Sequence, residues 1–125
     1  MSIVAAVEIR SRAEAAPFTT VDGSTIRSLL DRSNAPVAHQ SLAEATIGAG
    51  EATVRHRHLE SEEIYYLVEG AGEMELDGER RAVAAGDAIL IPPGAWHQIR
   101  ASGDGPLRLL CACAPPYRHE DTYFQ

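Results

Sequence analysis

Short apolar segments separated by glycine and proline turns are the feature that most constrains the fold of this 125-residue chain. Residues 37–47, 62–68, 88–91 and 107–114 have the length of β-strands, and turns such as 92–94 separate them. No stretch shows the sustained periodicity of a long amphipathic helix. Many short strands at regular spacing are typical of a sandwich or barrel. The sequence therefore predicts a single all-β domain.

The two ends of the chain have weaker patterns. Residues 3–9 alternate in polarity, which predicts a half-buried strand near a sheet edge, and residues 18–21 predict another short strand. Residues 24–30 fit either a short helix capped by Ser24 or a strand, and a sheet-rich chain favours the strand. The tail, residues 115–125, is interpreted as irregular.

Charge and cysteine content exclude several classes of partner and chemistry. A net charge of −7 with scattered arginines argues against nucleic acid or an anionic membrane. All 11 basic residues are arginines, which excludes Schiff-base chemistry on lysine. Cys111 and Cys113 are spaced for one face of a strand and not for a disulfide. With no basic leader and no apolar run of membrane-spanning length, we expect a cytoplasmic protein.

Residues 50–70 carry the groups with the clearest chemistry. In a strand, side chains alternate between two faces, so His56 and His58 share one face while Arg55 and Arg57 occupy the other. Unpaired arginines are costly to bury, which makes the histidine face the interior one. Two imidazoles are therefore expected on one wall of the interior.

A carboxylate follows these histidines, and three glutamates are available: Glu60, Glu62 and Glu63. Parity with Tyr65 and Leu67 favours Glu63 as the inward side chain. If the chain turns back after the histidine strand, this carboxylate lies beside the imidazoles. That arrangement is the geometry of a metal site.

A cavity is predicted next to this cluster. If Glu44 faces water, alternate residues of 37–47 face inward, and because most of them are small they leave space. They are His39, Ser41, Ala43, Ala45 and Ile47. The residues assigned to the substrate pocket are His39, Gln40, Tyr65, Cys111 and Cys113, with the inward choice between His39 and Gln40 left open. Tyr65 is also the catalytic candidate, expected to orient or protonate substrate, with core packing as the alternative.

Two spaced motifs resemble those of the cupin superfamily, in particular its small single-domain bacterial members. They are Gly50-x5-His56-x-His58-x4-Glu63-x6-Gly70 and Gly86-x5-Pro92-x-Gly94-x2-His97. The resemblance implies a double-stranded β-helix, or jelly-roll, barrel over about residues 37–114, preceded by residues 1–36 and followed by the tail 115–125. It also implies a set of metal ligands: His56, His58, Glu63 and His97.

The ligand count implied by this resemblance favours particular ions and reactions. Four protein ligands would saturate Zn²⁺, whereas octahedral Fe²⁺, Mn²⁺, Ni²⁺ or Co²⁺ keeps two open positions; zinc would still bind during preparation. We therefore expect one divalent ion and Lewis-acid chemistry of the isomerase, lyase, dehydratase or cyclase type on a small oxygenated substrate. The alternatives are an Fe(II)-dependent dioxygenase and a non-catalytic small-molecule or sugar-binding protein.

Self-association is a further expectation. Ile64, Tyr66 and Val68 occupy the face opposite Glu63, so both faces of this strand are apolar. An apolar outer face and the edge strand at residues 3–9 offer surfaces for a second copy. The sequence therefore predicts a homodimer.

Overall fold

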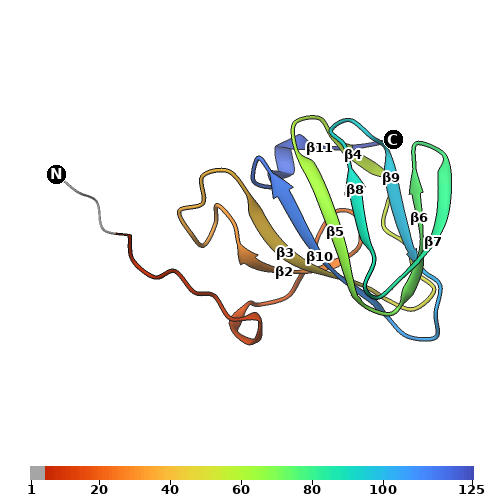
Figure 1. The fold of residues 1–125 in the computed structure, drawn as a ribbon, viewed down its shortest axis with the longest axis horizontal. Coiled ribbons are helices and arrows are strands. Elements are labelled where there is room, and N and C mark those ends of the chain that lie inside the picture. Colours follow the sequence, from red (N-terminus) through yellow and green to blue (C-terminus); the bar gives the residue numbers. More distant parts are fainter. Residues whose placement is uncertain (1–4) are drawn as a thin grey trace.

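The computed structural model describes residues 5–125 and shows two antiparallel β-sheets packed face to face (Figure 1). The first sheet contains β1 (Phe18–Thr19), β2 (Thr25–Leu30), β3 (Ser41–Ile47), β10 (Leu107–Ala114), β5 (Glu62–Glu69) and β8 (Ala88–Ile91), in that order. The second contains β11 (Thr122–Phe124), β4 (His56–His58), β9 (His97–Ala101), β6 (Ala71–Leu76) and β7 (Glu79–Ala84), in that order. This architecture confirms the all-β, jelly-roll prediction.

Helical structure is limited to two 3-10 turns, Arg12–Glu14 and His119–Asp121, within the described part of the chain. None of the helices in residues 5–125 has the length and apolar character of a membrane span.

The central strands follow the sequence patterns, and the ends of the chain do not. Residues 24–30 form a strand, as favoured. The strand predicted at residues 3–9 is absent from residues 5–9, which run away from the barrel without a partner strand (Figure 1), and residues 3–4 lie outside the described residues. The prediction of an irregular tail is wrong, because β11 lies in the tail and pairs with β4. Both errors arise because pairing at an edge depends on partners distant in sequence.

Strand β3 begins at Ser41, four residues later than predicted. Glu44 lies on its outer face but is only 3% exposed, which corrects the expectation that it faces water. Its carboxylate is covered by two ion pairs, with Arg12 Nε at 2.7 Å and with Arg108 Nη1 at 3.2 Å. Arg12 comes from the N-terminal segment, which is thereby fastened to the outside of the barrel.

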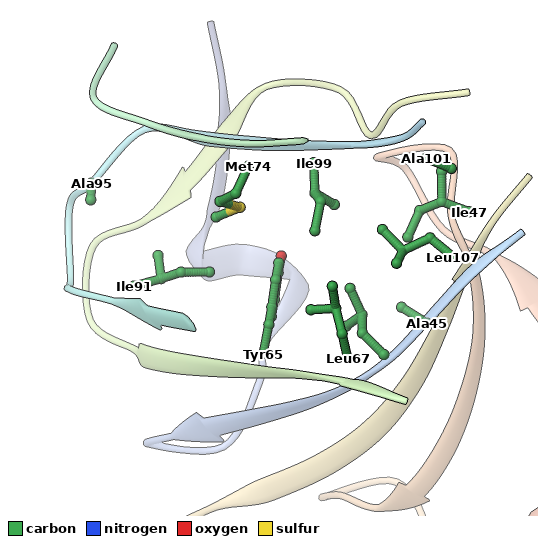
Figure 2. Packing of buried hydrophobic residues seen from close by; sticks show 11 residues of the cluster. Ala45, Ile47, Tyr65, Leu67, Met74, Ile91, Ala95, Ile99, Ala101 and Leu107 are labelled. Carbon is green, nitrogen blue, oxygen red and sulfur yellow. The ribbon is translucent and has the colours of Figure 1, made fainter. Parts of the chain in front are cut away.

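Apolar side chains from the two sheets fill the space between them. Leu67 and Leu107 extend from the first sheet toward Met74 and Ile99 of the second, and the Tyr65 hydroxyl points into the interior (Figure 2). Leu67 and Leu107 are fully buried. Each such side chain stabilises the fold by about 1.5–3 kcal/mol relative to an exposed position. This core fixes the strands that carry the site.

Candidate metal centre

Three buried imidazoles converge from two adjacent strands. His56 and His58 lie on the same face of β4, and His97 on β9 is paired directly opposite His56. The ring centroids of His56 and His97 are 4.3 Å apart, and those of His58 and His97 are 5.7 Å apart. Arg57 lies on the opposite face of β4, where its guanidinium covers the ring of Trp96. The predicted alternation along this strand is therefore present.

Glu63 reaches the imidazoles from the other sheet. Its Oε1 atom lies 2.9 Å from His58 Nε2 and 3.3 Å from His97 Nε2. One potential ligand atom from each of the four side chains lies within 4.8 Å of the others. Glu60 and Glu62, the competing carboxylates considered from sequence, are exposed. The structure thus brings Glu63 to the histidines.

Hydrogen bonds at Nδ1 orient all three imidazoles. The partners are backbone carbonyl oxygens, of Val54 for His56 at 2.7 Å, of Asp121 for His58 at 3.1 Å and of Ala95 for His97 at 3.0 Å. A carbonyl oxygen only accepts, so Nδ1 carries the hydrogen and Nε2 of each neutral ring keeps a free lone pair. Metal-ligating histidines are held in this way.

The innermost atoms of the cluster lack hydrogen-bond partners. Among the residues that the structure describes, Glu63 Oε1 and His97 Nε2 are both buried without one, although they are in contact at 3.3 Å. Both atoms are acceptors when His97 is neutral, so their contact is repulsive unless a cation lies between them. Imidazole nitrogens and a carboxylate oxygen suit first-row divalent ions. The donor set therefore fits a divalent metal ion.

The charges within the cluster agree with this assignment. Burial alone would raise the pKa of Glu63, but attraction to His58 and His97 holds that pKa well below its ordinary value. Burial lowers the pKa of His58, yet the Glu63 carboxylate raises it above the ordinary value overall. Burial and the charge of His97 lower the pKa of His56. Without a metal ion, the Glu63 carboxylate therefore favours the protonated form of His58, and a divalent ion bound at this position would replace that proton.

The C-terminal tail holds the loop between the two ligand strands β4 and β5. The buried carboxylate of Asp121 accepts hydrogen bonds from the backbone N–H groups of Leu59, Glu60 and Ser61, at 3.0–3.1 Å. The Asp121 carbonyl also orients His58. The sequence analysis assigned this residue no role, and no local pattern around it marks the contact.

A cavity of about 120 Å³ adjoins the cluster and is lined by His56, His58 and Glu63. Small side chains of β3 form another part of its wall, as the sequence analysis expected for Ser41, Ala43 and Ala45. The remaining apolar lining comprises Phe18, Val21, Ile26, Ile47, Ile99 and Leu109. Among the described lining residues, the charged side chains other than histidine are the carboxylates of Asp22, Asp31 and Glu63, and none is an arginine. The cavity is therefore apolar and anionic.

Asp22 is a site residue that the sequence analysis missed. Its Oδ1 atom accepts hydrogen bonds from the Ser24 N–H at 2.9 Å and the Ser24 hydroxyl at 2.6 Å. Its Oδ2 atom lies 3.9 Å from His56 Nε2, and both residues line the cavity. In the sequence, Asp22 lies between two predicted strands, residues 18–21 and 24–30, where side-chain alternation gives it no direction. A free carboxylate oxygen thus faces the cavity beside a ligand candidate.

Tyr65 lines the cavity between the ligand cluster and the core. Its ring meets that of His97 edge-on, with centroids 6.1 Å apart. Burial, together with the nearby charge of Glu63, raises the pKa of Tyr65 well above its ordinary value. The phenol therefore stays protonated and acts as a hydrogen-bond donor.

The two cysteines lie on the far side of the Glu63 carboxylate. Cys111 Sγ is 2.8 Å and Cys113 Sγ is 3.4 Å from Glu63 Oε2, and the two sulfur atoms are 3.7 Å apart. Hydrogen bonding with Cys113 and burial raise the pKa of Cys111 well above its ordinary value. Both thiols line the cavity, as the pocket assignment from sequence expected.

His39 and Gln40 lie away from this cavity. Both are exposed, and they line a separate surface depression with Leu42 and Ala112. The residues precede β3 instead of belonging to it, so strand alternation does not direct either side chain inward. Their assignment to the pocket is therefore corrected.

A family model described as Cupin domain matches residues 43–113, more than half of the chain. The chain belongs to the cupin family. All four ligand candidates of this cupin lie within the matched residues. Asp22 and Asp121 lie outside them.

Three known proteins illustrate the likeness. The uncharacterized protein MJ1618 of Methanocaldococcus jannaschii is 50% identical over 106 residues, covering 85% of each chain. Polyketide synthase CurC of Streptomyces cyaneus is 32% identical over 105 residues, covering 80% of this chain and 68% of CurC. The structure of Streptomyces Pac13, a nucleoside dehydratase, superposes with a TM-score of 0.74 at 18% identity over 96% of this chain and 92% of its own. At that identity the structural likeness concerns the fold alone.

Proposed function

We propose that this cupin is a mononuclear metalloenzyme that performs Lewis-acid chemistry on a small oxygenated substrate, of the isomerase, dehydratase or cyclase type. The observation that carries the proposal is the convergence of three Nε2 lone pairs and an ionised carboxylate oxygen on the wall of an apolar cavity. When bound, a divalent ion supplies electrostatic stabilisation for an oxygen anion that forms as a proton leaves the substrate. Fe²⁺, Mn²⁺, Ni²⁺ or Co²⁺ would keep positions open for that substrate.

The charge of the cavity supports an uncharged substrate. Carboxylates of Asp22 and Asp31 line it, and the described lining offers no guanidinium to pair with a substrate carboxylate or phosphate. A bound divalent ion would offset only part of the charge of the three carboxylates, so an anionic ligand would lose its hydration in a cavity that still repels it. A nucleoside, hydroxyketone or phenolic polyketide fits these walls better. The relative CurC is named a polyketide synthase, and the structurally similar Pac13 is a nucleoside dehydratase.

Two cavity side chains supply the proton transfers. The free Oδ2 of Asp22 accepts a proton from the substrate carbon or hydroxyl, because its other oxygen is held by Ser24. The protonated Tyr65 hydroxyl, on β5, donates a hydrogen bond to the substrate. The apolar lining excludes bulk water during the transfer.

A substrate panel in D₂O tests the proposal. Protein loaded with each candidate ion is incubated, with and without oxygen, with uncharged hydroxyketones, nucleosides and phenolic polyketide mimics, each matched to a carboxylated analogue. Mass spectrometry follows deuterium incorporation and product formation. We expect oxygen-independent exchange or turnover of uncharged members, lost in Asp22→Asn with the metal retained.

Other outcomes would contradict this function in distinct ways. Turnover that requires oxygen would favour the dioxygenase alternative. A ligand that binds and is recovered unchanged, without deuterium, would favour the non-catalytic binding protein.

The homodimer is also part of the proposal. Ile64 and Leu90 are cross-strand partners on the outer face of the first sheet, and they are 44% and 56% exposed; Tyr66 beside them is 45% exposed. This apolar face supports association with a second copy. Sedimentation at the mass of one chain at micromolar concentration would contradict the homodimer.

A cytoplasmic location is proposed as well, supported by the free thiols of Cys111 and Cys113.

A further inference from the structure

We infer that Cys111, Cys113 and the second oxygen of Glu63 form a binding site for a soft metal ion, separate from the histidine cluster. The pairing of β10 with β5 places Cys113 opposite Glu63 and Cys111 opposite Tyr65, so both thiols face the cavity. The ligand atoms of Glu63, Cys111 and Cys113 lie within 4.8 Å of one another. Two cysteine sulfurs, which release their protons to solvent when the ion binds, and a carboxylate are a donor set for Zn²⁺, Cd²⁺ or Cu⁺.

The spacing of the two sulfur atoms matches tetrahedral coordination. With zinc–sulfur bonds of about 2.3 Å, two tetrahedral thiolate ligands lie about 3.8 Å apart. The observed separation of Cys111 Sγ and Cys113 Sγ is 3.7 Å. A carboxylate oxygen would lie about 3.6 Å from each sulfur, against 3.4 Å for Cys113 and 2.8 Å for Cys111. Binding therefore requires only that Glu63 and Cys111 separate by less than an ångström.

The Glu63 carboxylate serves the two donor sets with different oxygens. Oε1 contacts the imidazoles of His58 and His97, whereas Oε2 contacts the thiols. An ion at the histidines would bind Oε1 and an ion at the cysteines would bind Oε2. The Glu63 carboxylate can therefore be a ligand of both ions at once. The fourth position of the thiol site opens to the cavity, which both cysteines line.

The histidine cluster and the cysteine pair favour different metal ions. Imidazole and carboxylate ligands suit Fe²⁺, Mn²⁺, Ni²⁺ and Co²⁺, whereas thiolates favour softer ions. A soft ion at the thiol site would add positive charge beside Glu63 and occupy the wall that faces the substrate. We therefore expect soft ions to bind this cupin in addition to the ion at the histidines.

Cadmium titration of the reduced full-length protein tests this site without any substrate. The readouts are bound cadmium per chain and the ultraviolet charge-transfer band that only thiolate–cadmium bonds produce. We expect two ions per chain and a strong band in wild type. Cys111→Ser/Cys113→Ser should bind one ion without the band, and His56→Ala/His97→Ala should bind one ion with the band. Circular dichroism checks that each variant is folded.

The same data separate this inference from the proposed function. Wild-type protein that binds cadmium without a charge-transfer band, or a band that needs the histidines, would overturn the thiol site. A single ion with the band in wild type would support the thiol site, and failure of the same protein to bind Co²⁺ or Mn²⁺ would contradict metal binding at the histidines.

Discussion

The barrel strands and the segments outside them contribute to the site in different ways. The four ligand candidates lie on β-strands within residues 43–113, whereas Asp22 and Asp121 come from outside that span. The barrel strands supply the four candidate ligand atoms, which lie within 4.8 Å of one another. The outer segments supply a free carboxylate facing the cavity and the contacts that hold a ligand loop. The candidate metal ligands can thus be predicted from the strands alone, whereas the proposed proton acceptor, Asp22, comes from outside them.

Substitution of Asp22 is expected to have the largest effect among the residues outside the barrel strands. Asp22→Asn keeps the hydrogen bonds from Ser24 at Oδ1 but replaces the proton-accepting Oδ2 with an amide. With a substrate found by the panel, we expect turnover to fall by about 10²–10⁴-fold, while metal content is unchanged. Asp104→Asn, in an exposed loop, is the matched control. Equal turnover in the two variants would remove Asp22 from the mechanism.

Asp121→Ala tests whether the tail positions a ligand. The change leaves the backbone N–H groups of Leu59, Glu60 and Ser61 without their acceptor and loosens the loop after His58. We expect metal affinity to fall by about 10–100-fold, as for other supporting contacts of metal sites, measured by competition with a chelator. Glu120→Ala, on the exposed neighbour, should have no effect. Unchanged affinity in Asp121→Ala would show that the barrel positions His58 without the tail.

The ion pairs of Glu44 give a smaller, pH-dependent effect. Burial would raise the pKa of Glu44, but Arg12 and Arg108 hold it below its ordinary value. The carboxylate therefore stabilises the fold above the ordinary glutamate pKa, and this contribution is lost as pH falls through the lowered pKa. We expect Glu44→Gln to lower the free energy of unfolding by about 1 kcal/mol at neutral pH and by progressively less in acid.

Chemical denaturation across the acid range measures the Glu44 effect. Glu69→Gln is the control, because Glu69 pairs with the same Arg108 but is 54% exposed. A difference between wild type and Glu44→Gln that persists unchanged at low pH would contradict the ion-pair explanation.

Side-chain alternation predicts the part of the site that lies on regular strands. It directs His56, His58 and Glu63 inward and correctly places Cys111 and Cys113 on the cavity wall. Alternation fails for His39, because β3 begins only at Ser41 and His39 precedes it. Alternation also does not show which segments cover the outer face of a sheet. The burial of Glu44 beneath Arg12 was therefore not predicted.

The contacts of Asp22 and Asp121 could not be predicted for a different reason. Each depends on a turn or tail lying against residues that are distant in sequence, and such packing has no periodic signature. Asp22 approaches His56, 34 positions later in the chain, and Asp121 binds a loop about 60 positions earlier. Their carboxylates became site residues only when the tertiary arrangement was known.

Elemental analysis shows whether the histidine cluster holds a metal ion. Untagged wild-type protein, purified without chelator, is compared with His58→Ala and with His39→Ala, whose exposed imidazole lies away from the cavity. We expect stoichiometric iron, manganese, nickel or cobalt in wild type and His39→Ala, and its loss in folded His58→Ala. A folded wild-type protein that holds no divalent ion even after loading, or a His58→Ala variant that holds as much as wild type, would contradict it.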